Sequence, residues 1–197
     1  MDNNFVIFGC SGHARVVLEN ILSNGDGHFL GWIDNTVKNG TKVFGFPVIG
    51  NDEDLKSLYL NEKFSGIVGI GNIVLRQKVV RYIVKHIPDF EFINSIHSSA
   101  IISPSANLGD GIAIMPGAII NSESKIGNHS IINTGSQVDH NCEVAEYVNI
   151  SPAVILGGNV KIGSSSNIGI GSLIINNLTI PNGTKIKAGT TLTRSIL

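Results

Sequence analysis

The run VDHNC at residues 138–142 holds the side chain best suited to proton transfer. Histidine exchanges a proton near neutral pH, and His140 is therefore a candidate general base. It stands two residues after the aliphatic Val138, at an expected turn, so its side chain should point outward and not into a core. Asp139 and Asn141 flank it and are candidate catalytic partners of the imidazole. A solvated surface histidine remains the alternative.

A second candidate site is the glycine-rich turn GCSGHA at residues 9–14, directly after an apolar run at 5–8. Such turns between a strand and a helix let backbone N–H groups approach a phosphate at the helix N-terminus. The spacing is GxxGxxA and not the dinucleotide pattern GxGxxG, so it favours a diphosphate cradle over an NAD site. Asp34 and Asn35 end the next strand, where their side chains would contact the ribose or the base of a nucleotide. A plain strand-ending turn remains the alternative.

The elements that must position His140 follow from a strict repeat, because an aliphatic residue occupies every sixth position from Ile102 onward. The positions are Ile102, Leu108, Ile114, Ile120, Ile126, Ile132, Val138, Val144, Ile150, Leu156, Ile162, Ile168, Ile174, Ile180, Ile186 and Leu192. Neither a helical period nor plain alternation gives this pattern. Three six-residue sides close a coil of 18 residues, and stacked coils form a parallel β-helix. Residues 18 apart should stack, which places Gly158 next to His140.

The first 96 residues follow a different pattern, in which short apolar runs alternate with helical spacing. Strands are expected at 5–8, 29–33 and 67–70, and helices at 13–22, 55–60 and 73–86. This order predicts a small parallel α/β sheet of Rossmann type. We therefore expect two domains, a Rossmann-like domain at residues 1–96 and a β-helix at 97–197.

The composition limits the classes of partner and the location. Formal net charge is −1, and no basic stretch suits nucleic acid or an anionic membrane. No apolar run of 18 residues exists, which argues against a transmembrane helix, and the first residues lack the basic start of a signal peptide. Cys10 and Cys142 are expected to be buried thiols in a reducing compartment, and the protein is therefore expected in the cytoplasm.

The order of motifs adds a resemblance to a known family. GCSGHA is followed by WIDN at 32–35, GIGN at 69–72, IHSSAIISPSA at 96–106 and INTGSQVDHNC at 132–142. This order, over nearly the whole chain, resembles the sialic acid O-acetyltransferase and nucleotide-4-aminosugar N-acetyltransferase family of hexapeptide-repeat proteins. The resemblance implies a left-handed β-helix, acetyl-CoA as co-substrate and a homotrimer that binds CoA between neighbouring subunits. It also implies a nucleotide-linked 4-amino-4,6-dideoxysugar, carried on UDP or dTDP, as the acceptor.

The resemblance also assigns expected roles to residues. Those expected to bind the nucleotide sugar are Gly9, Ser11, Gly12, His13, Asp34, Asn35, Gly71, Asn72 and Asn133. Those expected to bind acetyl-CoA are Gly158, Ile170 and Ala188. His140 matches the family's histidine base, which would accept the amine proton as the nitrogen attacks the thioester. Because Gly158 has no side chain, it is interpreted as leaving space for the thioester arm of acetyl-CoA. The alternative is a turn glycine with positive φ. An acetyl-cysteine intermediate is not expected, because Cys142 should point inward.

The chain departs from the family pattern in two places. Relatives usually carry Asp or Glu where this chain has Asn141, so Asp139 or Glu123 would have to supply a carboxylate. Relatives also usually continue into a G-V-P-A-like tail, and its absence after Leu197 predicts a more open CoA pocket or a truncated chain.

Three other functions stay open. O-acetylation of a sialic acid or another sugar would use the same base. A metal hydrolase or carbonic anhydrase needs three histidines, whereas the coils offer only His129 and His140, so no metal is expected. A catalytically inactive sugar-binding or scaffold protein is the remaining class.

Overall fold

The computed structural model of this chain describes residues 4–25 and 27–196. The described residues divide into two compact units, the first ending at Ser95 and the second beginning at Ile96. The boundary expected from the sequence lies one residue further along the chain.

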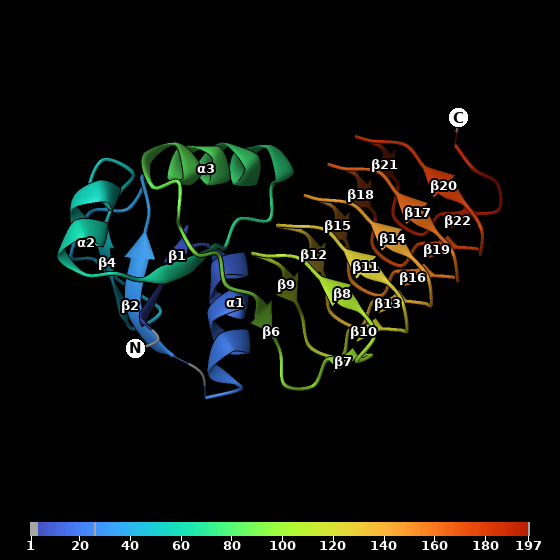
Figure 1. Cartoon of the computed structure of the whole chain (residues 1–197), viewed down its shortest axis with the longest axis horizontal. Helices are drawn as coiled ribbons and strands as arrows, with labels where there is room; N and C mark the ends of the chain where they lie inside the picture. The colour runs from blue at the N-terminus through green and yellow to red at the C-terminus, as the bar shows by residue number, and fades with distance from the viewer. Residues whose placement is uncertain (1–3, 26, 197) are drawn as a thin grey trace. The chain divides into compact units, whose positions relative to one another are not determined.

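The first unit is an α/β sheet with strand order β3-β4-β2-β1-β5 (Figure 1). Its strands are β1 (Asn4–Phe8), β2 (His28–Ile33), β3 (Lys42–Val43), β4 (Phe46–Gly50) and β5 (Ser65–Val68). Its helices are α1 (Gly12–Leu22), α2 (Leu55–Asn61) and α3 (Ile73–His86). All strand pairs are parallel except β3 with β4. The sequence therefore predicted the Rossmann-like order correctly, but not the hairpin β3–β4.

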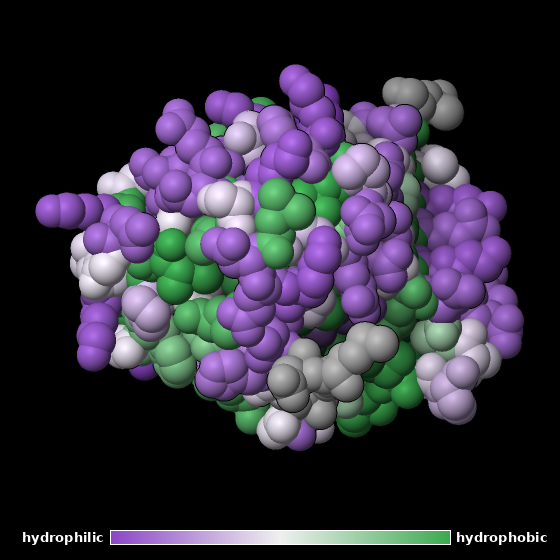
Figure 2. Space-filling model, turned by 60° about the vertical axis from the view of Figure 1, so that its left-hand side comes forward, coloured by the Kyte–Doolittle hydropathy of each residue, from purple (hydrophilic) through white to green (hydrophobic). Residues whose placement is uncertain are grey.

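The central strands of this sheet are buried on both faces. Val6, Ile7 and Ile67 are fully inaccessible to solvent, as parallel strands covered by helices require. Hydrophilic side chains cover most of the face shown in Figure 2, with small hydrophobic patches between them. None of the described helices combines the length and the apolar character that a membrane crossing requires.

The second unit is a left-handed parallel β-helix of two-residue strands in three sheets. One sheet holds β7 (Ile101–Ile102), β10 (Ile119–Ile120), β13 (Gln137–Val138), β16 (Ile155–Leu156), β19 (Leu173–Ile174) and β22 (Thr191–Leu192). A second holds β8 (Asn107–Leu108), β11 (Lys125–Ile126), β14 (Glu143–Val144), β17 (Lys161–Ile162) and β20 (Thr179–Ile180). The third holds β6 (Ser95–Ile96), β9 (Ala113–Ile114), β12 (Ile131–Ile132), β15 (Asn149–Ile150), β18 (Asn167–Ile168) and β21 (Lys185–Ile186).

The register confirms the 18-residue coil. Val138 pairs with Leu156, and Leu156 pairs with Ile174, in strict parallel alignment. The second residue of each strand points inward, and from Ile114 to Ile180 these side chains are at most 2% exposed. Stacked aliphatic side chains therefore form one continuous core, and they fix which residue follows each strand at a turn.

Candidate active site

The turn after β13 is held from inside the β-helix by a buried serine. Ser124 Oγ donates to the carbonyl of Asp139 at 2.6 Å and accepts from the N–H of Cys142 at 3.0 Å. Ser124 is fully buried, so both bonds are shielded from water. The turn at residues 139–142 is thereby fixed, and His140 projects outward from it, as predicted.

The imidazole of His140 occupies the space beside Gly158. A Cβ placed on Gly158 would lie 2.6 Å from His140 Cε1 and 2.7 Å from Nε2, closer than a Cβ atom packs against its neighbours. The interpretation of Gly158 as a turn glycine is therefore wrong, because it does not have a positive φ. The space expected for the thioester arm holds the histidine ring, and contact of Gly158 with acetyl-CoA stays a prediction. The glycine makes room for the imidazole of the preceding coil.

Asn141 is the side chain that orients the ring. Its Oδ1 lies 2.9 Å from His140 Nδ1. With the proton on Nδ1, the imidazole donates this bond and Nε2 keeps a free lone pair. Asn141 has φ of 57°, and asparagine tolerates this left-handed conformation better than most residues. The geometry therefore suits a neutral imidazole that accepts a proton at Nε2.

Asp139 faces the preceding coil and not the imidazole. Its Oδ1 accepts from the N–H of His140 at 2.8 Å and from Asn121 Nδ2 at 3.0 Å. These bonds hold the pKa of the Asp139 carboxyl below its usual range. These contacts do not join the Asp139 carboxylate to the ring, and its expected role in place of the family carboxylate stays a prediction. The backbone N–H of Glu123 donates to Ser105 Oγ at 3.1 Å, and the expected role of its carboxylate at the ring stays a prediction.

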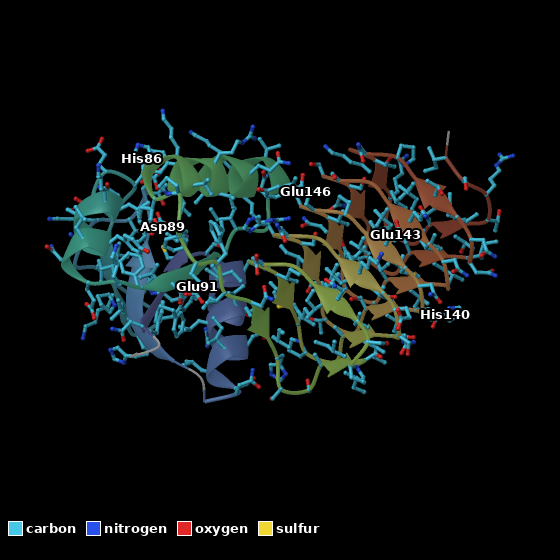
Figure 3. All side chains as sticks on the ribbon, viewed as in Figure 1. His86, Asp89, Glu91, His140, Glu143 and Glu146 are labelled. Carbon is cyan, nitrogen blue, oxygen red and sulfur yellow. The ribbon has the colours of Figure 1, made fainter. Side chains whose placement is uncertain are left out.

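A pocket of about 410 Å³ opens beside His140. Its lining also includes Asp139, Gly158 and the apolar side chains Ile155 and Leu173. Each of these two apolar residues is 40% exposed. Figure 3 shows His140 at the outer edge of the β-helix. The ring therefore stands where a bound molecule can reach it.

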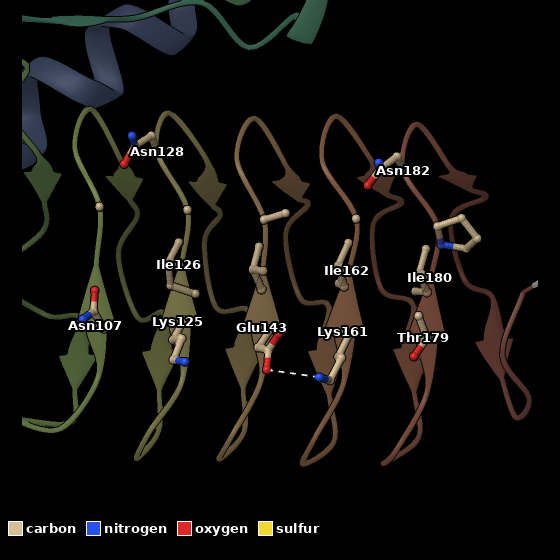
Figure 4. A pocket seen from close by; sticks show the side chains of 16 residues that line it. Asn107, Lys125, Ile126, Asn128, Glu143, Lys161, Ile162, Thr179, Ile180 and Asn182 are labelled. Atoms are coloured by element: carbon tan, nitrogen blue, oxygen red, sulfur yellow. Dashed lines mark ion pairs between the residues drawn. The ribbon is translucent and has the colours of Figure 1, made fainter.

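A larger groove of about 720 Å³ lies on the sheet of β8, β11, β14, β17 and β20 (Figure 4). Lys161 Nζ and Glu143 Oε1 form an ion pair of 3.2 Å across it. None of the residues predicted to form the site lines this groove. The candidate base His140 lines the smaller pocket and not this groove.

Three other predicted residues lie at a different corner of the coils. Asn133, Ile170 and Ala188 follow β12, β18 and β21, whereas His140 and Gly158 follow β13 and β16. Asn133 Oδ1 accepts from the N–H of Thr134 at 2.8 Å. Ile170 is 59% exposed. Within one chain, the structure does not bring these residues to His140.

The glycine-rich turn connects β1 to α1. Gly9 has φ of 91°, and its missing side chain leaves space for Ile70, whose Cγ1 would lie 2.9 Å from a Cβ there. Ser11 is the N-cap of α1 and makes no side-chain capping bond. A Cβ on Gly12 would meet nothing within 4 Å. The start of α1 is therefore open on this side, as a phosphate site requires.

Asp34 ties this turn to the end of β2. Its Oδ2 accepts from the N–H of Cys10 at 3.0 Å and lies 3.2 Å from Cys10 Sγ. Burial, together with Asp34, raises the pKa of the Cys10 thiol to about 11. Burial alone would raise the pKa of Asp34, but hydrogen bonds from Thr36 and Cys10 outweigh it and lower the pKa. Asp34 thus holds two loops together, and its expected contact with a base stays a prediction.

Asn35 is also bonded within the chain. Its Nδ2 donates to Asp52 Oδ2 at 2.6 Å, and its Oδ1 accepts from the N–H of Asp52 at 2.9 Å. Asn72 is the N-cap of α3, where its Oδ1 accepts from the N–H of Leu75 at 3.0 Å. Both amides therefore have structural roles, and contacts with a ligand stay predictions.

His13 is mostly shielded, and its Nε2 has no hydrogen-bond partner. Burial and the nearby charge of Arg76 lower the pKa of His13 to about 4, so the imidazole is neutral at pH 7. Arg76 was missed by the sequence analysis, because arginine usually lies at the surface. It is 1% exposed. Its spacing from Val80 and Ile83, the other buried residues of α3, is the signal that indicates its burial.

Among residues 4–25 and 27–196, no three histidine, cysteine, aspartate or glutamate side chains gather as a metal site requires. His129 packs against Tyr147, with ring centroids 5.2 Å apart. A Cβ on Gly111 would lie too close to the His129 ring. His129 is therefore part of a packed turn and lies away from His140.

Comparison with known proteins gives this geometry its context. The PglD N-terminal domain matches residues 4–83. A GDP-perosamine N-acetyltransferase of Escherichia coli O157:H7 is 30% identical over 152 residues, which cover 74% of this chain and 66% of that protein, just under two thirds. A histidine-to-asparagine variant of perosamine N-acetyltransferase from Caulobacter crescentus, solved with CoA and GDP-perosamine, is 37% identical. It has a TM-score of 0.90 and covers 98% of this chain and 90% of its own.

The chain belongs to the nucleotide-aminosugar N-acetyltransferase family.

The acetyltransferase domain of PglB from Neisseria gonorrhoeae FA1090, solved with acetyl coenzyme A, fits the same family. It is 30% identical, has a TM-score of 0.89 and covers 100% of this chain and 93% of its own. The family expected from the motifs is therefore confirmed. The Escherichia and Caulobacter relatives are linked to GDP-perosamine, and not to the UDP or dTDP sugars expected from the sequence.

Proposed function

We propose that this protein transfers the acetyl group of acetyl-CoA to the amino group of a GDP-linked amino sugar, with His140 as general base. The observation that carries the proposal is the fixed imidazole: Asn141 holds Nδ1, and the residue lines an open pocket. A chain with this geometry, in a family whose solved members hold CoA and GDP-perosamine, is suited to direct transfer.

The proposed reaction needs one base and no covalent enzyme intermediate. The sugar amine attacks the thioester carbonyl, and a C–N bond forms while His140 Nε2 accepts the amine proton. The C–S bond then breaks, and the proton passes to the leaving thiolate of CoA. Cys142 is fully buried with a raised pKa, which supports a route without an acetyl-cysteine. Because the thioester is already activated, positioning supplies most of the rate.

A histidine in the Caulobacter relative supports the separation of binding from chemistry. Two variants, with this histidine replaced by asparagine or alanine, both hold CoA and GDP-perosamine. In that protein, binding of both molecules therefore survives loss of the histidine. We propose that His140 is its counterpart and acts in the reaction more than in binding.

We propose that the nucleotide diphosphate binds at the carboxyl edge of the sheet in the first unit. Ligands of open parallel sheets bind at this edge. The open start of α1 at Ser11 and Gly12 offers backbone N–H groups to phosphate oxygens. Gly71 lies against the His13 ring on the neighbouring loop, where a Cβ would be 3.9 Å from His13 Cγ.

We propose a homotrimer that binds CoA between neighbouring chains. His140 and the residues Ile170 and Ala188 lie at different corners of one β-helix, so a second chain is needed to bring them together. The outward apolar residues of the sheet containing β13 support such an interface, since Ile101 is 64% exposed. Acetyl-CoA and nucleotide sugars are cytoplasmic metabolites, and the proposal accordingly places the enzyme in the cytoplasm.

Mass spectrometry tests the reaction directly. The purified protein would be incubated with acetyl-CoA and GDP-perosamine, and in parallel with UDP- and dTDP-linked amino sugars. GDP-mannose, whose sugar offers hydroxyl groups and no amino group, is the matched control for O-acetylation. We expect one acetyl group on GDP-perosamine and none on GDP-mannose. Acetylation of GDP-mannose alone, or of no amino sugar, would contradict the proposal.

A further inference from the structure

A buried cation lies beneath the loop that follows β5. Arg76 on α3 is 1% exposed, and its Nη1 donates to the carbonyls of Ile70 at 2.8 Å and Gly71 at 3.0 Å. A guanidinium is always charged in a folded protein, and its burial is costly. Two successive carbonyls turn toward this one group, so Arg76 fixes the course of the loop.

This loop adjoins the glycine-rich turn. β5 pairs with β1, and the N–H of Gly69 donates to the carbonyl of Phe8 at 2.9 Å, at the point where both strands end. A Cβ on Gly69 would lie 2.7 Å from the Cβ of Ala14, so the loop approaches the first turn of α1 closely. The buried charge is therefore next to the edge at which the diphosphate is proposed to bind.

The positive charge of Arg76 changes the electrostatic potential at that edge of the sheet. The shifted pKa of His13, which belongs to the first turn of α1, is caused by burial and by the Arg76 guanidinium. A field that disfavours a second positive charge at His13 favours a negative charge in the same place. The low dielectric around a buried group preserves this effect against screening by salt.

We infer that Arg76 is a positioning residue for the nucleotide diphosphate: it holds the Ile70–Gly71 loop in place and supplies a fixed positive charge behind the phosphate site. This inference rests on the proposed function. Arg76 acts through the loop and through its field, and it does not contact the ligand. The motif of the glycine-rich turn does not include Arg76, which belongs to a different helix.

Calorimetry with GDP and GMP tests the inference, because the two nucleotides share a base and differ in negative charge. Arg76→Gln keeps an amide donor for the loop carbonyls but removes the charge. We expect the Kd for GDP to rise about tenfold or more, and the preference for GDP over GMP to fall about threefold. Arg76→Lys keeps the charge and should keep the preference. Arg81→Gln, which removes an exposed arginine from the same helix, should change neither value.

The outcomes separate a charge effect from a merely structural one. Equal losses of GDP and GMP affinity in Arg76→Gln, or an unchanged Kd for GDP, would overturn the inference. Acetyl transfer by the wild-type protein would still support the proposed function in that case. Failure of both Arg76 variants to fold would assign Arg76 to folding alone and overturn it as well. A wild-type protein that binds no GDP would overturn both proposals.

Discussion

At the scale of single residues, the two nitrogens of His140 have distinct surroundings that follow from the turn. Asn141 meets Nδ1 because it occupies the left-handed position next in the chain, and Gly158 lies beside Nε2 because it stacks one coil later. A neutral amide orients the ring without adding a charge. The imidazole is therefore positioned by one hydrogen bond and by the lack of a side chain at Gly158.

Gly158→Ala should displace the imidazole, because the added Cβ would lie 2.6 Å from its Cε1. We expect kcat/KM to fall about 10- to 100-fold, since a misplacement of about 1 Å can cost that much. The melting temperature should change little, because Gly158 does not have a positive φ. Steady-state kinetics measure the effect. The control is the same substitution in His140→Ala, where no further loss is expected; an equal loss there would mean that Gly158 acts elsewhere.

His13 should make stability depend on pH. Its pKa is about 4 in the folded protein and 6.5 ordinarily, so the unfolded chain takes up the proton first as pH falls. The free energy of unfolding should therefore be highest above pH 6.5 and fall by up to about 3 kcal/mol as pH drops to about 4. Urea unfolding at several pH values measures this slope.

His13→Gln is the control for the pH slope, because it has no titrating ring. We expect most of the slope between pH 6.5 and 4 to disappear in this variant. The lowered pKa of Asp34 acts mainly below its ordinary value of 3.8 and contributes only at the acid end of this window. An identical slope in His13→Gln and the wild-type protein would show that other groups cause it.

At the scale of elements, α3 begins at a capped end beside the Ile70–Gly71 loop. Asn72→Ala removes the bond from Asn72 Oδ1 to the N–H of Leu75, and we expect the free energy of unfolding to fall by about 1 kcal/mol. Asn72→Asp keeps an acceptor at the cap and should retain wild-type stability. Urea denaturation distinguishes them. Full stability of Asn72→Ala would mean that the cap does not hold the helix.

The strands of the β-helix were predictable because one rule repeats without interruption. Each sixth aliphatic residue is the inward residue of a strand, and the 18-residue stacking of Val138, Leu156 and Ile174 follows by counting. Helix α3 was also predictable from its apolar spacing, and its observed bounds Ile73–His86 match the expected ones. Periodic burial leaves a direct trace in the sequence.

Structural features that depend on a single contact could not be predicted from a sequence pattern. The hairpin β3–β4 contains Phe44, Gly45 and Pro47 and lacks an alternating pattern, so it was missed. The burial of Arg76 was not predicted, because its carbonyl partners belong to a loop. Stacking placed Gly158 beside His140 correctly, but the direction of the ring depends on rotamer and hydrogen bonding, which no spacing records.

At the scale of the whole molecule, activity should depend on assembly. Ile101→Glu with Ile119→Glu places charges on the outward apolar row of β7 and β10, and burying them in an interface would be costly. We expect light scattering to show loss of the trimer, with acetyl transfer reduced about tenfold or more and GDP binding retained. Lys125→Glu, on a different side of the β-helix, should remain trimeric. A fully active monomer would contradict the shared site.

The central claim is that His140 is the base of an acetyl transfer to a nucleotide-linked amine, and the rate of His140→Ala tests it most directly. We expect kcat/KM for GDP-perosamine to fall about 10²- to 10⁴-fold, the range for loss of a general base, with melting temperature and the Kd values of CoA and GDP unchanged. A folded His140→Ala protein that acetylates GDP-perosamine at nearly the wild-type rate would contradict the account.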